Sequence, residues 1–549
     1  MTAAINQQKA HNDLLLLPDV LDEVREWEIV VNGAPLREQT AMALDALADV
    51  NDPPFVFQRA RSLVRVAYDE NDMPIIETLS EAGIRGILER CAVFVKKNIK
   101  GGTSPVAPPI DVVRDLAALP VWYTIPPLAG IIECPTILAD NTLITAPGYN
   151  PKTRLYYAPV PGLKLPPIPE SPTKDDLANA VEGIQEVFTD FPFVDDASRA
   201  NTYAALFSLV LRPMISGAVP LALIDKPQAG TGASLIAESI AIIATGRHAA
   251  IMTAPKDDSE WKKTTTSTLL QGRTLAIVDN VEQKLFAPSL AGVLTSSTWT
   301  DRRLGISEMV SLPNRLVWLA TGNNVQLGGD LPRRCYWIRM DAKSARPWQR
   351  EGFKHPNLLE WLQNERGRIL AAIITIARAW ILAGKPSPDI TVPKMGGFDE
   401  WREAVGGILA YCGVPGFLSN VEQMYAQADV DTPQWEAFFE EWYSFWGERG
   451  VTVAELARTM QDGNNSTQQT FADNSLRDVL PDILADAWNG KKNFSRVMGK
   501  ALARMNERVF PNGLQLSKGD KEHQAVVWHV KRTADYLDNN RSVEGELQK

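Results

Sequence analysis

Between about residues 174 and 345, the spacing of the hydrophobic residues along the chain changes repeatedly. Short apolar runs, which are typical of buried strands, alternate with segments whose apolar residues recur at helical spacing. The runs that predict strands are residues 221–224, 250–253, 274–278 and 315–320. A helix is predicted to open at Ser234, because apolar side chains recur at helical spacing from there on. Alternation of this kind predicts an α/β fold, and we expect one such domain over residues 174–390.

The segment before this region has mixed patterns. Residues 1–158 combine short helical and strand patterns, with a hairpin turn predicted at Asp140-Asn141, so we expect an N-terminal α+β domain. Six prolines fall within residues 158–173, and residues 159–173 are therefore expected to form an extended linker. The linker ends at Thr173-Lys-Asp-Asp176, which is a helix-start signature.

A second proline-bearing break, GKPSPDITVPKMGG, follows a long helical pattern over residues 355–383. We expect a further, mainly helical domain over residues 391–549. Within it a basic helical segment, NFSRVMGKALARMNERVF, is followed by a turn and by a strand-like run, QAVVWHV. A helix, a basic helix and a β-ribbon in this order predict a winged-helix-like region.

Charge is unevenly distributed along the chain. The formal net charge is −10, which argues against a protein that is held to nucleic acid over its whole surface. Residues 491–532, however, hold ten Lys and Arg against three Asp and Glu. A basic patch on an acidic body is compatible with DNA binding that is confined to one face or channel.

Composition is that of an ordinary globular protein. The 549 residues suggest about three domains, and 45% hydrophobic and 22% charged residues are typical values. The four cysteines and five histidines are isolated in the sequence, so neither a zinc site nor a disulfide framework is expected. Because no stretch approaches membrane-spanning length and the N-terminus does not resemble a signal peptide, we expect a cytoplasmic protein without a membrane partner.

Residues 221–234, LALIDKPQAGTGAS, combine a short apolar strand, a turn of small residues and a helix start. This is the layout of a phosphate-binding loop, in which backbone N–H groups and a helix N-terminus surround an anion. The motif G-x-x-x-x-G-K-[ST] is incomplete, because Pro227 replaces the first glycine and Ala233 replaces the lysine. The candidate phosphate-binding residues are Ala229, Gly230, Thr231, Gly232, Ala233, Ser234 and Leu235.

An acidic residue ends the strand predicted at 274–278. Asp279 and the adjacent Asn280 follow that strand, about 45 residues after the phosphate loop. A buried strand that ends in a carboxylate is the layout in which nucleotide-binding proteins hold Mg²⁺. We therefore expect Ser234 and Asp279 to be the metal-binding residues, with Asp279 and Asn280 in the catalytic site.

The strand predicted at 315–320 leads to Asn323, and Arg333 and Arg334 follow after a short loop. An arginine that is offered across a subunit interface can stabilise the charge that develops during phosphoryl transfer. The alternative for these two arginines is an ion pair within their own chain.

Residues 299–310, which lie between these two strands, place extended residues on both sides of a glycine turn. This pattern predicts a β-hairpin with a basic, partly apolar tip, formed by Arg302, Arg303, Leu304, Gly305 and Ile306. Such a tip can grip the phosphates and sugars of single-stranded DNA without reading its sequence. The alternative is ordinary solvated surface charge.

The order and spacing of these motifs resemble the superfamily 3 helicases of the AAA+ class. The resemblance is strongest to the helicase half of the poxvirus-type primase-helicases that phages, plasmids and integrated elements carry. The matching stretches are DFPFVD, KPQAGTGAS, IAIIATGR, DDSEWKK, IVDN, RRLGISEMVSLP, ATGNN and GDLPRRC. Upstream APPIDVV, LAGIIECPTIL and PGYNPKTRLYYAP also match, as does GFDEWREAVGGILAYCGVPGFL downstream, so that roughly residues 55–530 are covered.

The resemblance implies an AAA+ P-loop ATPase core that uses ATP and Mg²⁺. Asn323 would then orient the attacking water, and Arg334, in preference to Arg333, would reach the site of a neighbouring subunit. The implied partners are single-stranded or forked DNA, further copies of the chain in a hexameric ring, and a separate primase or replication initiator. For residues 1–158 the resemblance implies a role in oligomerisation or in DNA entry.

Ala233 departs from the family pattern, which has lysine at this position. Three explanations are open: a deliberate inactivating substitution, a natural pseudo-ATPase, or rescue by another cation such as Lys226. The first is favoured because the other parts of the motif set all remain: the loop glycines, Ser234, Asp279, Asn323 and Arg334. We therefore expect an ATP-dependent DNA helicase of a mobile element that Ala233 impairs, with a non-hydrolysing DNA-binding ring or scaffold as the alternative.

Overall fold

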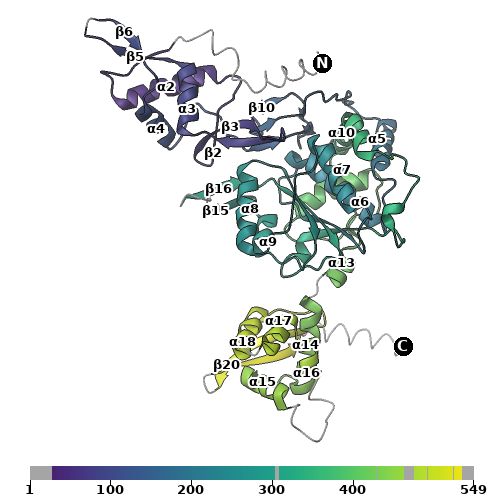
Figure 1. The fold of residues 1–549 in the computed structure, drawn as a ribbon. Helices are drawn as coiled ribbons and strands as arrows, with labels where there is room; N and C mark the ends of the chain where they lie inside the picture. Colours follow the sequence, from purple (N-terminus) through teal and green to yellow (C-terminus); the bar gives the residue numbers. More distant parts are fainter. Residues whose placement is uncertain are drawn as a thin grey trace. The chain divides into compact units, whose positions relative to one another are not determined.

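The computed structural model describes residues 27–99, 101–302, 308–428, 431–462, 475–490, 493–522 and 525–533 (Figure 1). Contacts divide the chain into two compact units. The first contains the chain up to Val325 together with Asp330–Tyr425, and the second contains Gln326–Gly329 and the chain from Ala426 onward. No helix in the described ranges is long and apolar enough to cross a lipid bilayer.

A five-stranded parallel sheet forms the centre of the first unit. Its strand order is β13 (Ile251–Met252), β14 (Leu275–Val281), β17 (Val317–Asn323), β12 (Leu221–Lys226) and β18 (Cys335–Arg339). The four predicted strands are confirmed, and so is the α/β class of this region. Strand β18 was not predicted, because its short run CYWIR directly follows the two arginines of a loop pattern. Every residue of β12 is buried, as expected for a strand that is covered on both faces.

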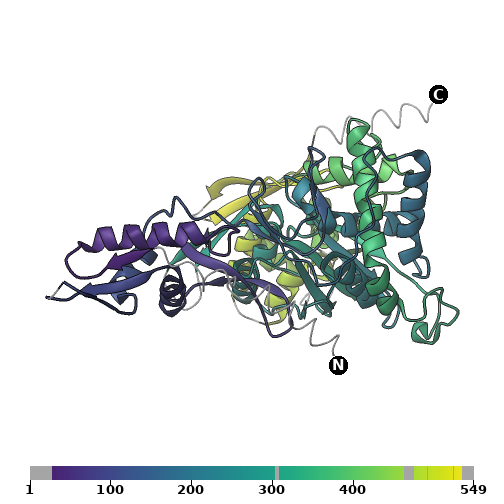
Figure 2. The same ribbon diagram turned by 90° about the horizontal axis from the view of Figure 1, so that it is seen from above.

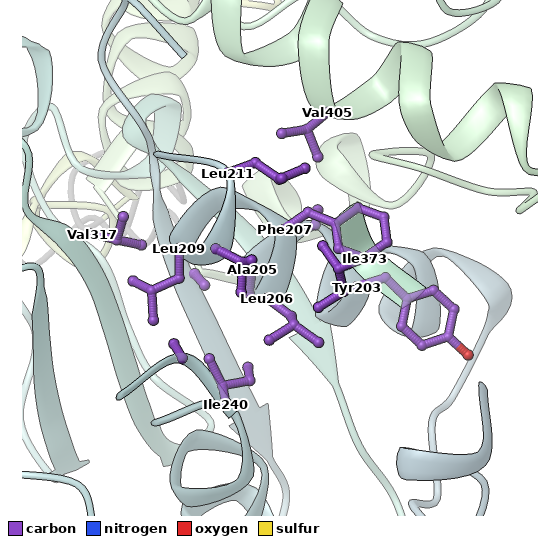
Figure 3. Packing of buried hydrophobic residues seen from close by; sticks show 14 of the residues in the cluster. Tyr203, Ala205, Leu206, Phe207, Leu209, Leu211, Ile240, Val317, Ile373 and Val405 are labelled. Atoms are coloured by element: carbon purple, nitrogen blue, oxygen red, sulfur yellow. The ribbon is translucent and has the colours of Figure 1, made fainter. Parts of the chain in front are cut away.

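Helices cover both faces of this sheet. Helices α6 (Asp196–Val210), α7 (Ala233–Thr245) and α10 (Leu358–Leu382) share one apolar cluster with the sheet. Figure 3 shows Phe207 of α6, Ile240 of α7 and Ile373 of α10 within that cluster. Helices α8 (Asp258–Leu270) and α9 (Pro288–Thr295) pack together elsewhere on the sheet, where Trp261 of α8 contacts Trp318 of β17 with ring centroids 6.1 Å apart.

The proline-rich segment packs along α10. Helix α5 (Lys174–Val187), which lies beside α10 (Figure 2), begins at a capping box between Thr173 and Asp176, as predicted. The segment before it has no regular structure, but Arg378 of α10 donates to the carbonyl of Pro169 (3.0 Å). A Cβ atom on Gly367 of α10 would meet the carbonyl oxygen of Lys164 at 1.9 Å. Residues 159–173 are therefore held on the first unit and are not a free spacer.

Residues 27–158 mix helices and strands, as predicted. The helices within the described part of this segment are α2 (Leu36–Val50), α3 (Glu81–Cys91) and α4 (Ile110–Ala118). The strands are β1 (Glu28–Val30), β2 (Phe57–Arg59), β3 (Ser62–Tyr68), β4 (Pro74–Thr78), β5 (Val93–Lys97), β6 (Thr103–Pro105), β7 (Gly130–Ile132), β8 (Thr136–Ile137), β9 (Leu143–Ile144), β10 (Gly148–Asn150) and β11 (Leu155–Tyr157). The predicted hairpin turn is confirmed, since β8 pairs with β9 and Asn141 has a φ of 71°.

Buried polar contacts join this N-terminal region to the parallel sheet. The guanidinium of Arg59 donates to the carbonyls of Leu269 and Leu270 at the end of α8 (2.7 and 2.8 Å). Arg247, just after α7, forms a buried ion pair with Glu133, whose pKa burial raises to about 7 against the opposing effect of that arginine. The N-terminal region therefore shares one compact unit with the sheet.

The first unit extends beyond the boundary predicted at residue 391. Helix α11 (Asp399–Trp401), the π turn Arg402–Gly406 and α12 (Gly407–Tyr411) follow the proline-bearing break. Trp401, Val405 and Ile408 are fully buried in the same apolar cluster as α7 and α10. The observed division falls instead within α13 (Val421–Ala428), because these apolar side chains complete the core of the first unit.

The second unit has its own aromatic core, which includes Trp435, Phe438, Phe439 and Trp442 of α14 (Asp431–Trp446). Its further helices, within the residues described there, are α15 (Val453–Asp462), α16 (Ser475–Asp478), α17 (Asp482–Asn489) and α18 (Phe494–Met505). Its sheet has the order β19 (Val451–Thr452), β21 (Ala525–Arg532), β20 (Leu514–Glu522), and all pairs are antiparallel. The predicted basic helix and the β-ribbon after it are both present.

Candidate functional site

The loop between β12 and α7 turns tightly over the end of the sheet. Gly230 and Gly232 have φ angles of 81° and 107°, which side chains rarely tolerate. The Thr231 hydroxyl donates to the carbonyl of Gln228 (2.8 Å), and the Gln228 amide donates to the carbonyl of Ser344. Because Gly232 at the helix start has no capping side chain, the first N–H groups of α7 are available to an anion.

Three oxygen-bearing side chains meet beside the first turn of α7. The Ser234 hydroxyl donates to Oδ1 of Asp279 (2.9 Å), and the Thr321 hydroxyl donates to the same oxygen (2.5 Å). Pairing between β14 and β17 shifts register between Val278 and Val281, so that Asp279 and Asn280 lie at an irregularity of the strand. The structure thus brings together the two residues predicted to bind metal.

Thr321 was not among the residues predicted for this site. It also accepts from the backbone N–H of Asn280 (3.0 Å), and it therefore connects the two strand ends. Its signal in the sequence was a threonine within a buried apolar run, two residues before Asn323. The oxygens of Ser234 and Asp279 are hard ligands of the kind that Mg²⁺ prefers, so the donor set fits the predicted metal.

The two predicted amide residues lie at the carboxyl edge of the sheet. Asn323 is exposed at the end of β17 and is the register partner of Lys226 on β12. Asn280 is exposed with a φ of 55°, and its side chain donates to Glu282 (2.8 Å). Because the carboxyl ends of parallel strands share one edge, both amides lie on the side of the sheet where Ser234 meets Asp279.

Arg333 and Arg334 differ in their surroundings, although both lie on one 3-10 turn, Pro332–Arg334. The side chain of Arg334 is 14% exposed; it donates to the carbonyl of Ala291 and the hydroxyl of Thr295 on α9, and it pairs with Asp330 at 2.5 Å. The side chain of Arg333 is 64% exposed and also pairs with Asp330, whose pKa it lowers. Ion pairing within the chain is thus present for both, but only Arg333 faces solvent.

A pocket of about 700 Å³ opens on the outer side of the loop. Its lining includes Gly230, Phe191, Trp348 and Phe353. Trp348 is 64% exposed and lies against the loop, since a Cβ atom on Gly230 would meet its ring at 3.1 Å. The sequence did not indicate this pocket, because its aromatic residues come from segments that are far apart in the chain. The lining also carries charged side chains, among them Glu186, Asp190 and Arg350, so a flat ring with polar edges, such as a nucleobase, suits this pocket.

A β-hairpin projects from the region of α8. Strand β15 (Thr298–Arg302) pairs with β16 (Met309–Pro313) in antiparallel register, so the predicted hairpin strands are confirmed. The Trp299 indole donates to the Thr266 hydroxyl of α8 (2.9 Å), which anchors the base of the hairpin. Arg302 is exposed, whereas Arg303, Leu304, Gly305 and Ile306 lie outside the described residues.

The basic helix of the second unit is amphipathic. Met498, Ala501 and Leu502 of α18 are buried in the core of that unit. The exposed basic side chains of the helix recur every four residues at Arg496, Lys500 and Arg504. They therefore form one stripe along the outer face of α18.

No protein-family model matches this chain, and no curated protein matches its sequence. Among solved structures, the chain is similar to the apo structure, A form, of the C-terminal region of NrS-1. That match has 11% sequence identity, covers 86% of this chain and 97% of that chain, and has a TM-score of 0.35. SCCmec type IV Cch, an active helicase, matches with 12% identity over 76% of this chain and 86% of that chain, with a TM-score of 0.27. TM-scores this low do not establish a common fold.

Proposed function

We propose that the first unit is an ATP-hydrolysing motor of the AAA+ superfamily 3 type. The observation that carries this proposal is the hydrogen bond between Ser234 and Asp279 beside a glycine loop in left-handed conformation. The bond joins the first turn of α7 to the end of a neighbouring parallel strand. Oxygen ligands and free backbone N–H groups then lie together at one edge, as binding of a metal-nucleoside triphosphate requires.

The topology of the sheet supports the same proposal. Strand β12 lies between β17 and β18, whereas β13 and β14 lie beyond β17. The chain therefore leaves β12 toward one side of the sheet and later crosses over it to form β18. In parallel α/β sheets, ligands bind at the carboxyl ends of the strands where the order reverses in this way.

The residues take complementary roles in this proposal. Backbone N–H groups of residues 229–235 surround the phosphates, and Ser234 with Asp279 holds Mg²⁺, which when bound neutralises phosphate charge. Asn323 orients the attacking water, with Asn280 beside it at the strand end. The aromatic pocket with Trp348 holds the base.

The proposed activity is that of a DNA helicase of a mobile genetic element. A hexameric ring of the chain would move on single-stranded or forked DNA, with Arg333 or Arg334 reaching the nucleotide site of a neighbour. The hairpin of β15 and β16 would hold the single strand, and the basic stripe on α18 would add a second DNA contact. A separate primase or replication initiator is the further partner in this proposal.

Ala233 favours a second candidate function. Without lysine on the first turn of α7, the phosphates lose a cation that the family places there. A non-hydrolysing ring that binds DNA and serves as a scaffold would need the nucleotide site only for assembly. Measurement of DNA-stimulated ATP hydrolysis on the purified chain, set against nucleotide binding, separates the two functions.

Replacing Trp348 with alanine is expected to weaken ATP binding about 10-fold, because an aromatic ring that stacks on a base contributes on the order of 1–2 kcal/mol. The measurement is titration of the protein with a fluorescent ATP analogue. Tyr123→Ala, which removes a fully exposed aromatic ring from the N-terminal region, is the control and should leave the affinity unchanged. Equal affinities for the wild-type protein and Trp348→Ala would show that the pocket does not hold the base.

Replacing both Arg302 and Arg303 with alanine is expected to weaken single-stranded DNA binding for all sequences. The salt dependence should also flatten by up to about two phosphate contacts, because each arginine that neutralises a phosphate releases a counterion. The measurement is fluorescence anisotropy of labelled oligonucleotides at several salt concentrations. The control pair is Arg37→Ala with Arg114→Ala, two exposed arginines of the N-terminal helices. An unchanged affinity and salt slope would identify the hairpin arginines as ordinary surface charge.

A further inference from the structure

We propose that the ammonium group of Lys226, at the end of β12, contacts the phosphates of the bound nucleotide and supplies the positive charge that Ala233 lacks. The inference rests on the proposed nucleotide site and goes beyond it, because it assigns the charge to a strand residue outside the helix. It predicts that this chain still binds ATP, although Ala233 slows hydrolysis.

The position of Lys226 on β12 directs its side chain to the face of the sheet that α7 covers. Side chains alternate between the faces of a sheet, and Ala222 and Ile224 of β12 pack in the apolar cluster that contains α7. Lys226 is two residues after Ile224 and therefore points to the same face. On the neighbouring strand, Thr321 is the register partner of Ile224, and its hydroxyl bonds to Asp279.

The ammonium group of Lys226 is poorly satisfied within the described residues. Lys226 is 6% exposed, and the one hydrogen bond that its ammonium makes there is a long one to the carbonyl of Gly322 (3.4 Å). An ammonium group has three donors, and burial of an unpaired charge is costly. Burial accordingly lowers the pKa of Lys226, while the carboxylates of Asp279 and Asp225 oppose that shift. An anion bound over the glycine loop would satisfy the remaining donors.

The nearest carboxylate on β12 has other partners. Asp225 pairs with Arg339 and accepts from the backbone N–H of Val325 (3.0 Å). No ion pair joins Lys226 to an acidic side chain among the described residues. A structural role in neutralising Asp225 therefore does not account for a buried lysine here.

The arginines around the site already form ion pairs or hydrogen bonds within the chain. Arg334 is bound to α9 and Asp330, Arg339 to Asp225 and Asn324, and Arg350 to the carbonyl of Asp190. Of these cations and Lys226, only the lysine combines deep burial on the α7 face with a single weak contact. A compact ammonium is also the group that phosphate loops use as a point charge.

The test compares Lys226→Met with the wild-type protein in binding of fluorescent ATP, ADP and AMP. The ATP and ADP affinities should fall about 10- to 100-fold, as expected for loss of a charged hydrogen bond to phosphate. AMP binding should change less than about threefold, since AMP relies on the base pocket. Lys256→Met, which removes an exposed lysine before α8, is the matched control and should bind like the wild type.

Restoring a cation from the helix provides the second arm. Adding Ala233→Lys to Lys226→Met should recover ATP affinity, and failure to recover it would assign Lys226 a structural role and overturn the inference. Equal ATP affinity of Lys226→Met and wild type would also overturn it. Thermal unfolding shows whether Lys226→Met is folded. If it is not, Lys226→Gln takes its place in the same binding measurements. If the wild-type protein binds no nucleotide at all, the proposed function itself fails, which is a different result.

Discussion

Replacing Ala233 with lysine is expected to raise the DNA-stimulated ATPase rate about 100- to 1,000-fold, since loss of one charge-stabilising contact in a transition state typically costs several kcal/mol. Ala233 is 1% exposed and begins α7 directly after the glycine loop. Because side chains on a helix lean toward its N-terminus, a longer side chain there would extend toward the loop. Its ammonium would then approach the β- and γ-phosphates from the helix, as the family pattern has it, whereas that of Lys226 would approach them from β12.

The measurement is steady-state phosphate release with and without single-stranded DNA. Ala233→Met is the matched control, because methionine has nearly the length of lysine and carries no charge. It should leave the rate at or below that of the wild-type protein. Equal rates for the wild type and Ala233→Lys would contradict the prediction and would favour the scaffold function.

Arg333→Ala, placed in the Ala233→Lys protein, is expected to lower ATP turnover by about 1,000-fold or more while ATP binding is kept. The physical reason is exposure: the side chain of Arg333 is 64% exposed and its ion pair with Asp330 lies at the surface, so it could exchange that partner for a phosphate of a neighbouring subunit. Arg334→Ala should act differently. It removes contacts to α9 from a mostly buried guanidinium, and it should lower the melting temperature through a loss of about 1–3 kcal/mol.

Mixed rings test whether the arginine acts between subunits. Subunits with Arg333→Ala are mixed with subunits with Asp279→Ala, both in the Ala233→Lys protein, and mixed assembly is verified by mass photometry. Neither parent should turn over ATP, whereas some mixed interfaces combine an intact Asp279 with an intact Arg333 and should recover part of the rate. Absence of recovery at every ratio, with mixed rings demonstrated, would rule out a shared site at Arg333. Recovery with Arg334→Ala in place of Arg333→Ala would identify Arg334 as the residue that reaches across.

Sequence patterns predicted correctly those helices, strands and caps that depend on residues close together in the chain. The strands at 221–224, 274–278 and 315–320 and the capping box at Thr173 are present as predicted. The hairpin strands on either side of residues 303–307 were also predicted correctly. Each of these features depends on hydrophobic period or on side-chain hydrogen bonds within a few residues, and both are visible in the order of amino acids.

Features that depend on contacts between residues far apart in the sequence could not be predicted from local patterns. The boundary expected at 391 moved to α13 because Trp401 and Val405 pack against helices that lie far away in the sequence. The proline-rich segment packs on α10 because Gly367 leaves room for the carbonyl of Lys164. A composition that indicates an extended segment does not reveal which surface that segment covers.

The order of amino acids was enough to predict which residues belong to the candidate site: a glycine loop, Ser234, Asp279, Asn323 and Ala233 in place of the lysine. How these residues contact one another follows only from the folded chain. Parallel pairing of β14 with β17, together with the register shift between them, places Thr321 beside Asp279. The alternation of side chains along β12 points Lys226 toward the face of the sheet that α7 covers. The tertiary structure also distinguishes Arg333 from Arg334, because Arg334 contacts α9 and is mostly buried, whereas Arg333 is exposed. Residue types and their spacings can be read from the sequence. Burial, register and the direction of a side chain arise only when strands from different segments pair.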